Sequence, residues 1–281
     1  MIAKSSKGDE FFPYGENPTM SLKTKLFVIL WLSGMAGVLS FLLVDLSALM
    51  AILPLPLGTK IPAITLAFKL LSLIQPAVLL ALAVLIGVGF ASKVGLSSPL
   101  AEAVAGGGQV GSAFKPQLIP GLFGGLAGGI SVVLITLLSK LFLPPEIITR
   151  IARFGKLLPL PTRLLYGGLT EELLLRWGLM TLIVWTAWRL FQKGQGLPKS
   201  AFFVSAILIS SVVFGIGHLP ITFVLVPEAA FALTLYVIVA NSMFGLIAGY
   251  LYWKKGLESA MIAHMVAHVV ILTASYFGAY F

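Results

Sequence analysis

The stretch SAFFVSAILISSVVFGIGHL, residues 200–219, contains no lysine, arginine, aspartate or glutamate. A helix of about 20 consecutive apolar residues is long enough to cross the hydrocarbon core of a bilayer. The proline that follows at position 220 disfavours helical geometry in the residue before it, so we expect the helix to end nearby. Residues 200–219 therefore predict a membrane-spanning helix.

Similar apolar stretches recur along the whole chain. Hydrophobic residues make up 58% of the 281 residues and charged residues only 10%, and the mean hydropathy of +1.02 excludes an ordinary soluble protein. We expect an all-α fold, a polytopic membrane helical bundle of about seven or eight transmembrane helices, integral to a lipid bilayer such as a prokaryotic cell membrane. The predicted spans are residues 27–53, 62–90, 120–142, 162–191, 200–219, 229–253 and 257–280.

Changes in composition divide the chain into three parts. Residues 1–20 are polar and predict a solvated N-terminal tail. Residues 92–119 are rich in glycine and serine and predict a loop, so we separate N-terminal transmembrane helices and their connection, 21–115, from a C-terminal bundle, 116–281. Early in that bundle, glycines recur every four residues in GLFGGLAGGIS, which predicts a face for close helix packing.

The basic residues flank the predicted spans instead of lining one surface, which indicates membrane topology and argues against nucleic acid as a partner. Lysines and arginines before the first span, after the fourth and after the sixth predict a cytoplasmic N-terminus. The basic stretch at 150–163 falls on the opposite side in a seven-helix count. It predicts either an amphipathic helix on the membrane surface or a miscount of one span.

Two adjacent carboxylates interrupt the fourth predicted span, in TEELLLRW, residues 170–177. A carboxylate at membrane depth is unfavourable by several kcal/mol, so it needs a partner or a function. Glu172 and Arg176 are four residues apart and can pair on one helix face. Glu171 points about 100° away and remains available for chemistry. Asp45 lies late in the first predicted span, where we expect it to reach the lipid headgroups.

All three histidines of the chain also fall in predicted apolar helices. Phe214 lies one turn before His218 and can pack on its ring, while His264 and His268 are one turn apart on a shared face. A glutamate and a histidine that converge on one water can act as a general base in hydrolysis, and further imidazoles can stabilise the oxyanion. Alternatively, these three histidines could hold a zinc ion, so zinc stays open as a cofactor. The lack of cysteine excludes thiolate metal sites and a cysteine nucleophile.

These residues resemble the CAAX prenyl protease and bacteriocin-processing family (CPBP, also called Abi) of intramembrane proteases. The family pattern is a glutamate pair followed by arginine, then phenylalanine with histidine four residues later, then histidine with asparagine or aspartate four residues later. In this chain the three elements read Glu171-Glu172-Leu-Leu-Leu-Arg176, Phe214-Gly-Ile-Gly-His218 and His264-Met-Val-Ala-His268. The third element departs from the pattern at His268. The resemblance covers about residues 160–275.

The resemblance implies a CAAX type II-like intramembrane endopeptidase of the glutamate type, with a metal-dependent version left open. It implies that Glu171 and His218 activate water, that His264 and His268 hold the oxyanion, and that the ion pair predicted above supports the helix. The departure at His268 puts the oxyanion role of that position in question. The implied substrate is a membrane-anchored or lipidated protein or peptide, such as a CAAX protein, a bacteriocin precursor or a protein with a sorting tail.

Two readings from other classes stay open. A proton- or ion-coupled transporter could use Glu171, Arg176 and the histidines as a relay. A non-catalytic immunity or scaffold protein could retain the same fold without turnover. Asn241 and Ser242, within the sixth predicted span, could line the cavity, but we favour a hydrogen bond between helices for them.

Overall fold

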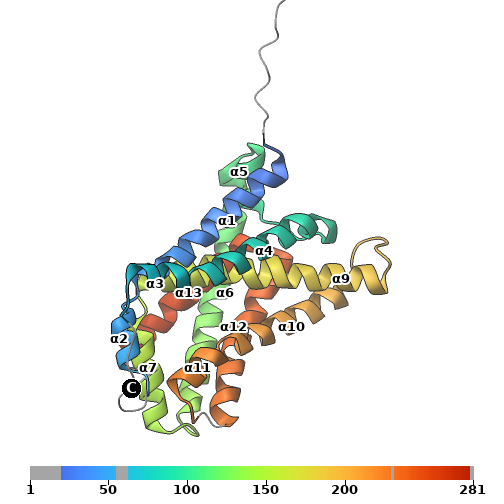
Figure 1. Cartoon of the computed structure of the whole chain (residues 1–281). Helices are drawn as coiled ribbons and strands as arrows, with labels where there is room; N and C mark the ends of the chain where they lie inside the picture. Colours follow the sequence, from blue (N-terminus) through green and yellow to red (C-terminus); the bar gives the residue numbers. More distant parts are fainter. Residues whose placement is uncertain (1–19, 55–62, 229–230, 279–281) are drawn as a thin grey trace, which may run out of the picture.

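The computed structural model describes residues 20–54, 63–228 and 231–278, and within these ranges every regular element is a helix. Seven helical stretches are long and apolar enough to cross a bilayer, in agreement with the predicted number. The protein is therefore an integral multi-pass membrane protein built as an all-helical bundle (Figure 1). The predicted polar tail lies outside the described residues, except for Met20.

The spans follow one another along the chain, and short helices lie between some of them. The first span comprises α1 (Leu22–Ser40) and η1 (Phe41–Leu43), the second comprises α3 (Leu66–Ser72), α4 (Ile74–Phe90) and η2 (Ala91–Val94), and the third is α6 (Val110–Ser139). The fourth span comprises α8 (Leu160–Thr162), η3 (Arg163–Glu171), η4 (Leu173–Met180) and α9 (Thr181–Phe191). The fifth comprises α10 (Ser200–Gly217) and α11 (Leu219–Leu225), the sixth is α12 (Phe231–Lys254), and the seventh is α13 (Leu257–Tyr276). The short helices α2 (Leu46–Ala51), α5 (Pro99–Gly106) and α7 (Pro145–Leu157) connect spans.

The first span ends earlier than the predicted 27–53, at Leu43. The reason is Asp45, whose carboxylate accepts hydrogen bonds from the backbone N–H groups of Ser47 and Ala48, at 2.9 and 3.0 Å. This is an N-cap, which begins the separate helix α2. Asp45 is thus a capping residue beyond the span and not a residue late within it.

The glycine- and serine-rich stretch 92–119 is largely helical, and the expectation of a loop is wrong. Gly95 and Gly107 end η2 and α5 with φ of 74° and 71°, a left-handed conformation that favours glycine. Pro99 occupies the first turn of α5, where its missing N–H has no helical partner to lose. Since α6 begins at Val110, the boundary proposed between 115 and 116 falls inside a helix.

The glycine repeat of α6 places this helix directly against α12 and α13. A Cβ atom on Gly125 would lie 2.5 Å from the Cβ of Val266, and one on Gly128 would lie 2.7 Å from the Phe244 ring. Glycine is required at both positions because no side chain fits between the helices. The predicted packing face is therefore present, and it fixes α13, which carries His264 and His268, against the rest of the bundle.

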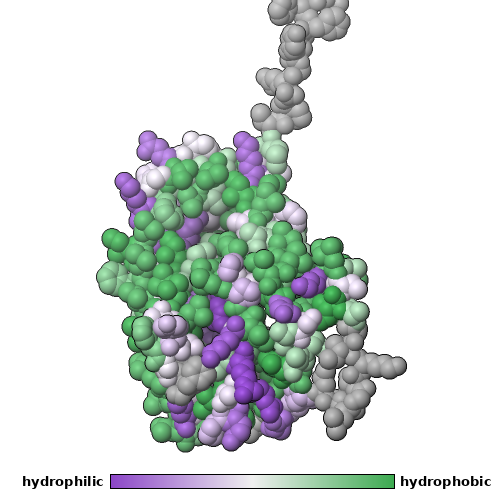
Figure 2. All heavy atoms as spheres, turned by 90° about the vertical axis from the view of Figure 1, so that its left-hand side faces the viewer, coloured by the Kyte–Doolittle hydropathy of each residue, from purple (hydrophilic) through white to green (hydrophobic). Residues whose placement is uncertain are grey.

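Large apolar side chains are exposed along the spans, as expected of helices that face lipid. Figure 2 shows one such face, with hydrophobic residues over most of it and hydrophilic ones at its upper edge and in its lower half. The amphipathic helix α7 packs Ile147, Ile151 and Phe154 against neighbouring apolar residues, while Arg150 contacts the Glu228 carboxylate at 3.1 Å. Because α7 is not among the seven candidate spans of the described residues, the basic stretch is an amphipathic helix and not a missed span.

Candidate active site

The fourth span carries both membrane-embedded glutamates on an unusual helix. Segments η3 and η4 are π-helical, so each N–H bonds the carbonyl five residues back instead of four. The hydroxyl of Thr170 anchors η3 to α1 by donating to the carbonyl of Gly34 at 2.7 Å. Such widened turns occur frequently at functional sites.

Glu172 and Arg176 form the ion pair that their spacing predicts. The Arg176 Nε atom lies 3.2 Å from Glu172 Oε2, and both side chains are fully buried. Arg176 also donates to the carbonyl oxygen of Gly245 at 3.0 Å and covers the Phe214 ring. The pair therefore ties the fourth span to both α12 and α10.

Glu172 has a second partner that spacing along one helix could not reveal. Its Oε1 atom lies 2.7 Å from Nδ1 of His264 on α13. If the carboxylate is ionised it can only accept, so Nδ1 carries the hydrogen and Nε2 of the neutral ring is left as an acceptor. A buried carboxylate that orients an imidazole in this way is the arrangement of a catalytic dyad.

Glu171 differs from its neighbour in its access to open space. Its side chain is 19% exposed while that of Glu172 is sealed, and its Oε2 lies 3.7 Å from Nε2 of His264. This separation is too long for a direct hydrogen bond. Glu171 is thus the carboxylate that water can reach, as its position on the helix predicts.

His218 lies at the end of α10 with its ring fixed from two sides. Nδ1 lies 2.9 Å from the carbonyl oxygen of Phe214, and the Phe214 ring meets the imidazole edge to face at 4.9 Å. Since a carbonyl only accepts, Nδ1 is the donor and Nε2 is the free acceptor. The predicted contact with Phe214 is confirmed, and it sets the tautomer needed for a base.

His264 and His268 stack one turn apart, with ring centroids 4.9 Å apart and an angle of 14° between the planes. Both face Gly167 of η3. A Cβ atom on Gly167 would lie 2.5 Å from Nε2 of His268 and 3.3 Å from Nε2 of His264. These lengths bracket the usual N–H···O distance, so the space left by the missing side chain is suited to one oxygen atom held by both rings.

One cavity of about 480 Å³ joins these groups. Glu171, His218, His264 and His268 all line it, together with Gly167, whereas Glu172 and Arg176 lie behind its wall. Most of the remaining lining is apolar: Phe41, Val44, Leu46, Leu49, Val132, Phe154, Leu158, Ile221, Phe244 and Ile271. The fold thus gathers a carboxylate and three imidazoles from three spans around a single apolar-walled space.

Residues 153–270 match the protein family described as type II CAAX prenyl endopeptidase Rce1-like. The match runs from the end of α7 into α13 and contains every residue of the three motifs. The match supports the resemblance to the CPBP family over this segment, which we call the Rce1-like domain. The match supports a CAAX-type membrane protease at the level of the family. No curated protein and no solved structure matches the chain.

The donor set of the Rce1-like domain does not fit a zinc site. Among the described residues, no three histidine, cysteine or acidic side chains group closely enough to hold a metal ion. His264 also uses Nδ1 for Glu172. No step below therefore depends on a metal.

Asn241 and Ser242 divide the two roles considered for them. Its amide nitrogen bonds the carbonyl of Val237 on its own helix at 2.8 Å, and its side chain lines the cavity. The hydrogen bond between helices comes from the next residue, since Ser242 donates to the carbonyl of Ser211 at 3.0 Å. The interhelical bond is thus confirmed for Ser242, while Asn241 takes the alternative role of lining the cavity.

Glu258 belongs to the support of the Rce1-like domain, although its position beside a loop had given no sign of burial. It is 6% exposed and accepts from the Ser98 hydroxyl at 2.6 Å and from the N–H groups of Leu100 and Ala101 at 3.1 and 3.2 Å. These N–H groups open α5 and have no helical partner. Glu258 thus caps α5 from the start of α13.

Proposed function

We propose that the protein is an intramembrane endopeptidase that hydrolyses a peptide bond of a membrane-associated protein, with water activated by Glu171 and His218. The observation that carries the proposal is the convergence of this carboxylate and three imidazoles on one cavity inside the bundle. The match to the Rce1-like family supports the same chemistry. Hydrolysis needs a base, an acid and a stabiliser of the oxyanion, and the cavity offers a candidate for each.

The base is the pair of Glu171 and His218. Both side chains line the same cavity, and each has an atom there that can accept a proton. In Glu171 this atom is an exposed carboxylate oxygen, and in His218 it is the free Nε2. A water between them loses a proton as its oxygen adds to the scissile carbonyl carbon. Glu172 cannot serve in this way, because it is sealed behind the wall and bonded on both sides.

The oxyanion is held in the space beside Gly167. His268 donates to it from Nε2, which takes the place of the amide or carboxyl group usual at this motif position. Glu171 passes the proton taken from water to Nε2 of His264 when these two atoms, 3.7 Å apart, close to hydrogen-bonding distance. His264 then becomes a donor, and its positive ring lies between the Glu171 and Glu172 carboxylates. The same proton passes to the leaving amine as the carbon–nitrogen bond breaks.

The substrate is a protein that carries a lipidated or transmembrane tail. The cavity wall is dominated by aliphatic and aromatic side chains, which favour an apolar segment over a charged one. Because the cavity is bounded by membrane spans, the scissile segment reaches it from within or beside the bilayer.

Purified protein in detergent or lipid, assayed with a panel of fluorescent membrane-tailed and lipidated peptides, tests the proposal. Glu171→Gln should abolish cleavage, since the amide keeps the shape but cannot take the proton. Glu146→Gln, an exposed change of the same kind on α7, is the matched control and should cleave normally. Normal turnover by Glu171→Gln would refute the assignment of the base, and solute uptake into liposomes without peptide cleavage would favour a transporter.

A further inference from the structure

A second cavity, of about 340 Å³, lies beside the catalytic one, and its size is within the range of small-molecule sites. Phe41, Leu46 and Tyr166 line both cavities, and the rings of Phe41 and Tyr166 meet edge to face at 4.7 Å. Most of the other lining residues come from α3 and α4, the two main parts of the second span. Neither Glu171 nor any histidine lines this cavity, so the proposed hydrolysis does not account for it.

The second cavity contains a lysine that lies within a membrane span. Lys69 is the fourth residue of the span Leu66–Val94, and its ammonium group donates to the carbonyl oxygen of Val44 at 3.2 Å. An ammonium group has three N–H donors, so two remain for another acceptor. No carboxylate of the described residues forms an ion pair with Lys69, and Asp45, next to Val44, caps α2 instead. Lys69 thus offers its positive charge to an anion in the cavity.

A second donor lies on the same side of the helix as Lys69. Ser72 and Gln75 follow at intervals of three residues, and all three side chains line the cavity. The Ser72 hydroxyl donates to the carbonyl oxygen of Lys69 at 2.7 Å, whereas the Gln75 amide makes no hydrogen bond to the described part of the chain. An ammonium group and an amide NH₂ can both donate to an anion with several oxygens, such as a phosphate group.

The polar end of the second cavity lies at the depth of the lipid headgroups. At a rise of about 1.5 Å per residue, the 29 residues of the second span cover about 43 Å, close to the whole thickness of a bilayer with its headgroups. Lys69 is then about 5 Å from the start of the span, within the headgroup layer, whereas Leu79 is about 20 Å from it, within the hydrocarbon. The cavity is therefore polar where headgroups lie and apolar where acyl chains lie.

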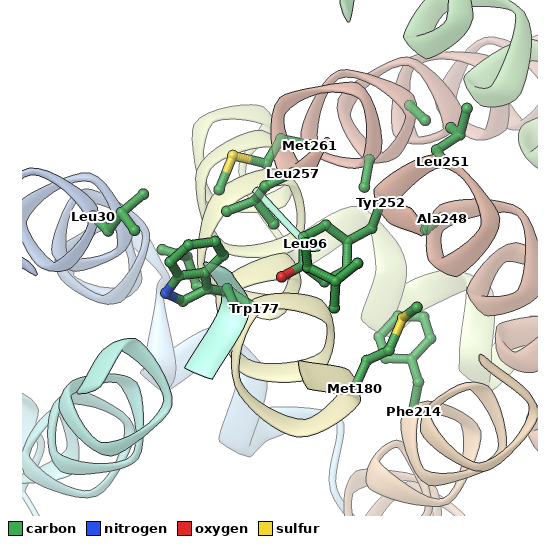
Figure 3. Close-up of a cluster of buried hydrophobic side chains, with 14 of the residues drawn as sticks. Leu30, Leu96, Trp177, Met180, Phe214, Ala248, Leu251, Tyr252, Leu257 and Met261 are labelled. Carbon is green, nitrogen blue, oxygen red and sulfur yellow. The ribbon is translucent and has the colours of Figure 1, made fainter. Parts of the chain in front are cut away.

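The inner wall of the second cavity belongs to the core of the bundle, and its outer side is open. Leu73 is part of the large cluster of buried apolar residues, and Tyr166 packs against that cluster. Figure 3 shows the part of the cluster around Trp177. Gln75 and Leu79, which line the cavity from the second span, are both exposed. Because exposed residues of a membrane span face lipid, a lipid molecule can enter the cavity past these two side chains.

We propose that the second cavity binds an anionic phospholipid, with the phosphate between Lys69 and Gln75 and an acyl chain along Leu73 and Leu79. A zwitterionic lipid carries its own cation beside the phosphate, so Lys69 favours a lipid with a net negative charge. The apolar part of the wall distinguishes a phospholipid from free phosphate. The bound lipid packs against Tyr166, in the wall shared with the catalytic cavity. The site follows from the second span alone and does not depend on the proposed function.

Native mass spectrometry of the purified full-length protein, with equimolar phosphatidylglycerol and phosphatidylcholine of the same acyl chains, tests the site. We expect the first bound lipid to be phosphatidylglycerol with about a fivefold preference, the effect of one lysine near a membrane surface. Lys69→Gln should remove this preference and Lys69→Arg should keep it. Lys140→Gln is the matched control, since Lys140 is also half-buried, follows the third span at the same end of the bundle and lines neither cavity. The control should keep the preference.

Two results would overturn the proposal. One is the same lipid preference in Lys69→Gln and Lys140→Gln. The other needs no variant: wild-type protein that binds the two lipids equally, or that releases phosphatidylglycerol when millimolar inorganic phosphate is added, has no site for an anionic phospholipid at this position. Retention of the lipid in the presence of phosphate supports the proposal. None of these measurements requires turnover, so loss of peptide cleavage would count against the proposed function and leave the lipid site intact.

Discussion

Replacement of Gly167 by alanine should block the chemistry while leaving the fold in place. The new Cβ would lie 2.5 Å from Nε2 of His268 and 3.3 Å from Nε2 of His264, in the space assigned to the oxyanion. Carbon and nitrogen atoms normally approach no closer than about 3.5 Å, so His268 must move by about 1 Å. A displacement of this size can lower a rate about 10²-fold, and loss of one oxyanion donor lowers kcat by about 10²–10³.

The fold should survive the same change. Overpacking by one methyl group lowers the free energy of unfolding by about 1–3 kcal/mol, whereas alanine in place of glycine within a helix raises it by about 1 kcal/mol. The assay is cleavage of a membrane-tailed peptide by purified protein, together with the thermal unfolding midpoint. We expect kcat to fall about 10²–10³-fold with a modest change in that midpoint.

Gly168→Ala provides the matched control. This neighbouring glycine is also buried, and its Cβ would crowd Met265, a flexible side chain that can adjust. The control should therefore suffer similar packing strain without occupying the space beside the imidazoles. Equal activity of the two variants, whether both high or both low, would refute the role given to that space.

Three further outcomes follow from the contacts around the site. Arg176→Met should lower the free energy of unfolding by about 3–5 kcal/mol, because it leaves the Glu172 carboxylate buried without its ion pair. Thermal unfolding measures this change, and an unchanged unfolding midpoint would contradict it. Glu258→Ala should destabilise the protein by about 1–3 kcal/mol through the orphaned N–H groups of α5, while peptide cleavage per folded molecule stays normal; a selective loss of kcat would argue against a purely structural role. His268→Asn should retain cleavage, since an amide can donate to the same oxyanion, whereas His268→Leu should not; equal loss in both variants would show that the imidazole itself is required.

The sequence was a good guide wherever one physical effect dominated. Apolar runs longer than the bilayer is thick left little choice, and all seven spans were found. The spacing of Glu172 and Arg176 fixed their pairing, because an i, i+4 contact depends only on local helix geometry.

Predictions of secondary structure and of span ends were wrong where one residue type is compatible with two local structures. Glycine and serine suggested a loop at 92–119, yet glycines also end helices, and Gly95 and Gly107 do so here. Asp45 was assigned to a span because hydropathy alone does not register an N-cap. The burial of Glu258 has no signal in the sequence, because its partners Ser98, Leu100 and Ala101 are distant along the chain.

The finer geometry of the site depends on contacts between spans and could not be derived from one helix at a time. The hydrogen bond from His264 to Glu172 joins residues on α13 and the fourth span. Gly167 did offer a signal, since it lies one turn before Glu171 and therefore on the same side of the helix. Its meaning became clear only when His264 and His268 were found opposite it.

The packed wall behind Glu171 has a consequence for the cell that makes this protein. Arg176, Trp177 and Tyr252 are each at most 1% exposed, so the described side chains pack closely behind the cavity. Water can thus enter from one side and be consumed without giving protons a conduit through the bilayer. A cell can carry many copies of such a hydrolase and still hold its transmembrane voltage.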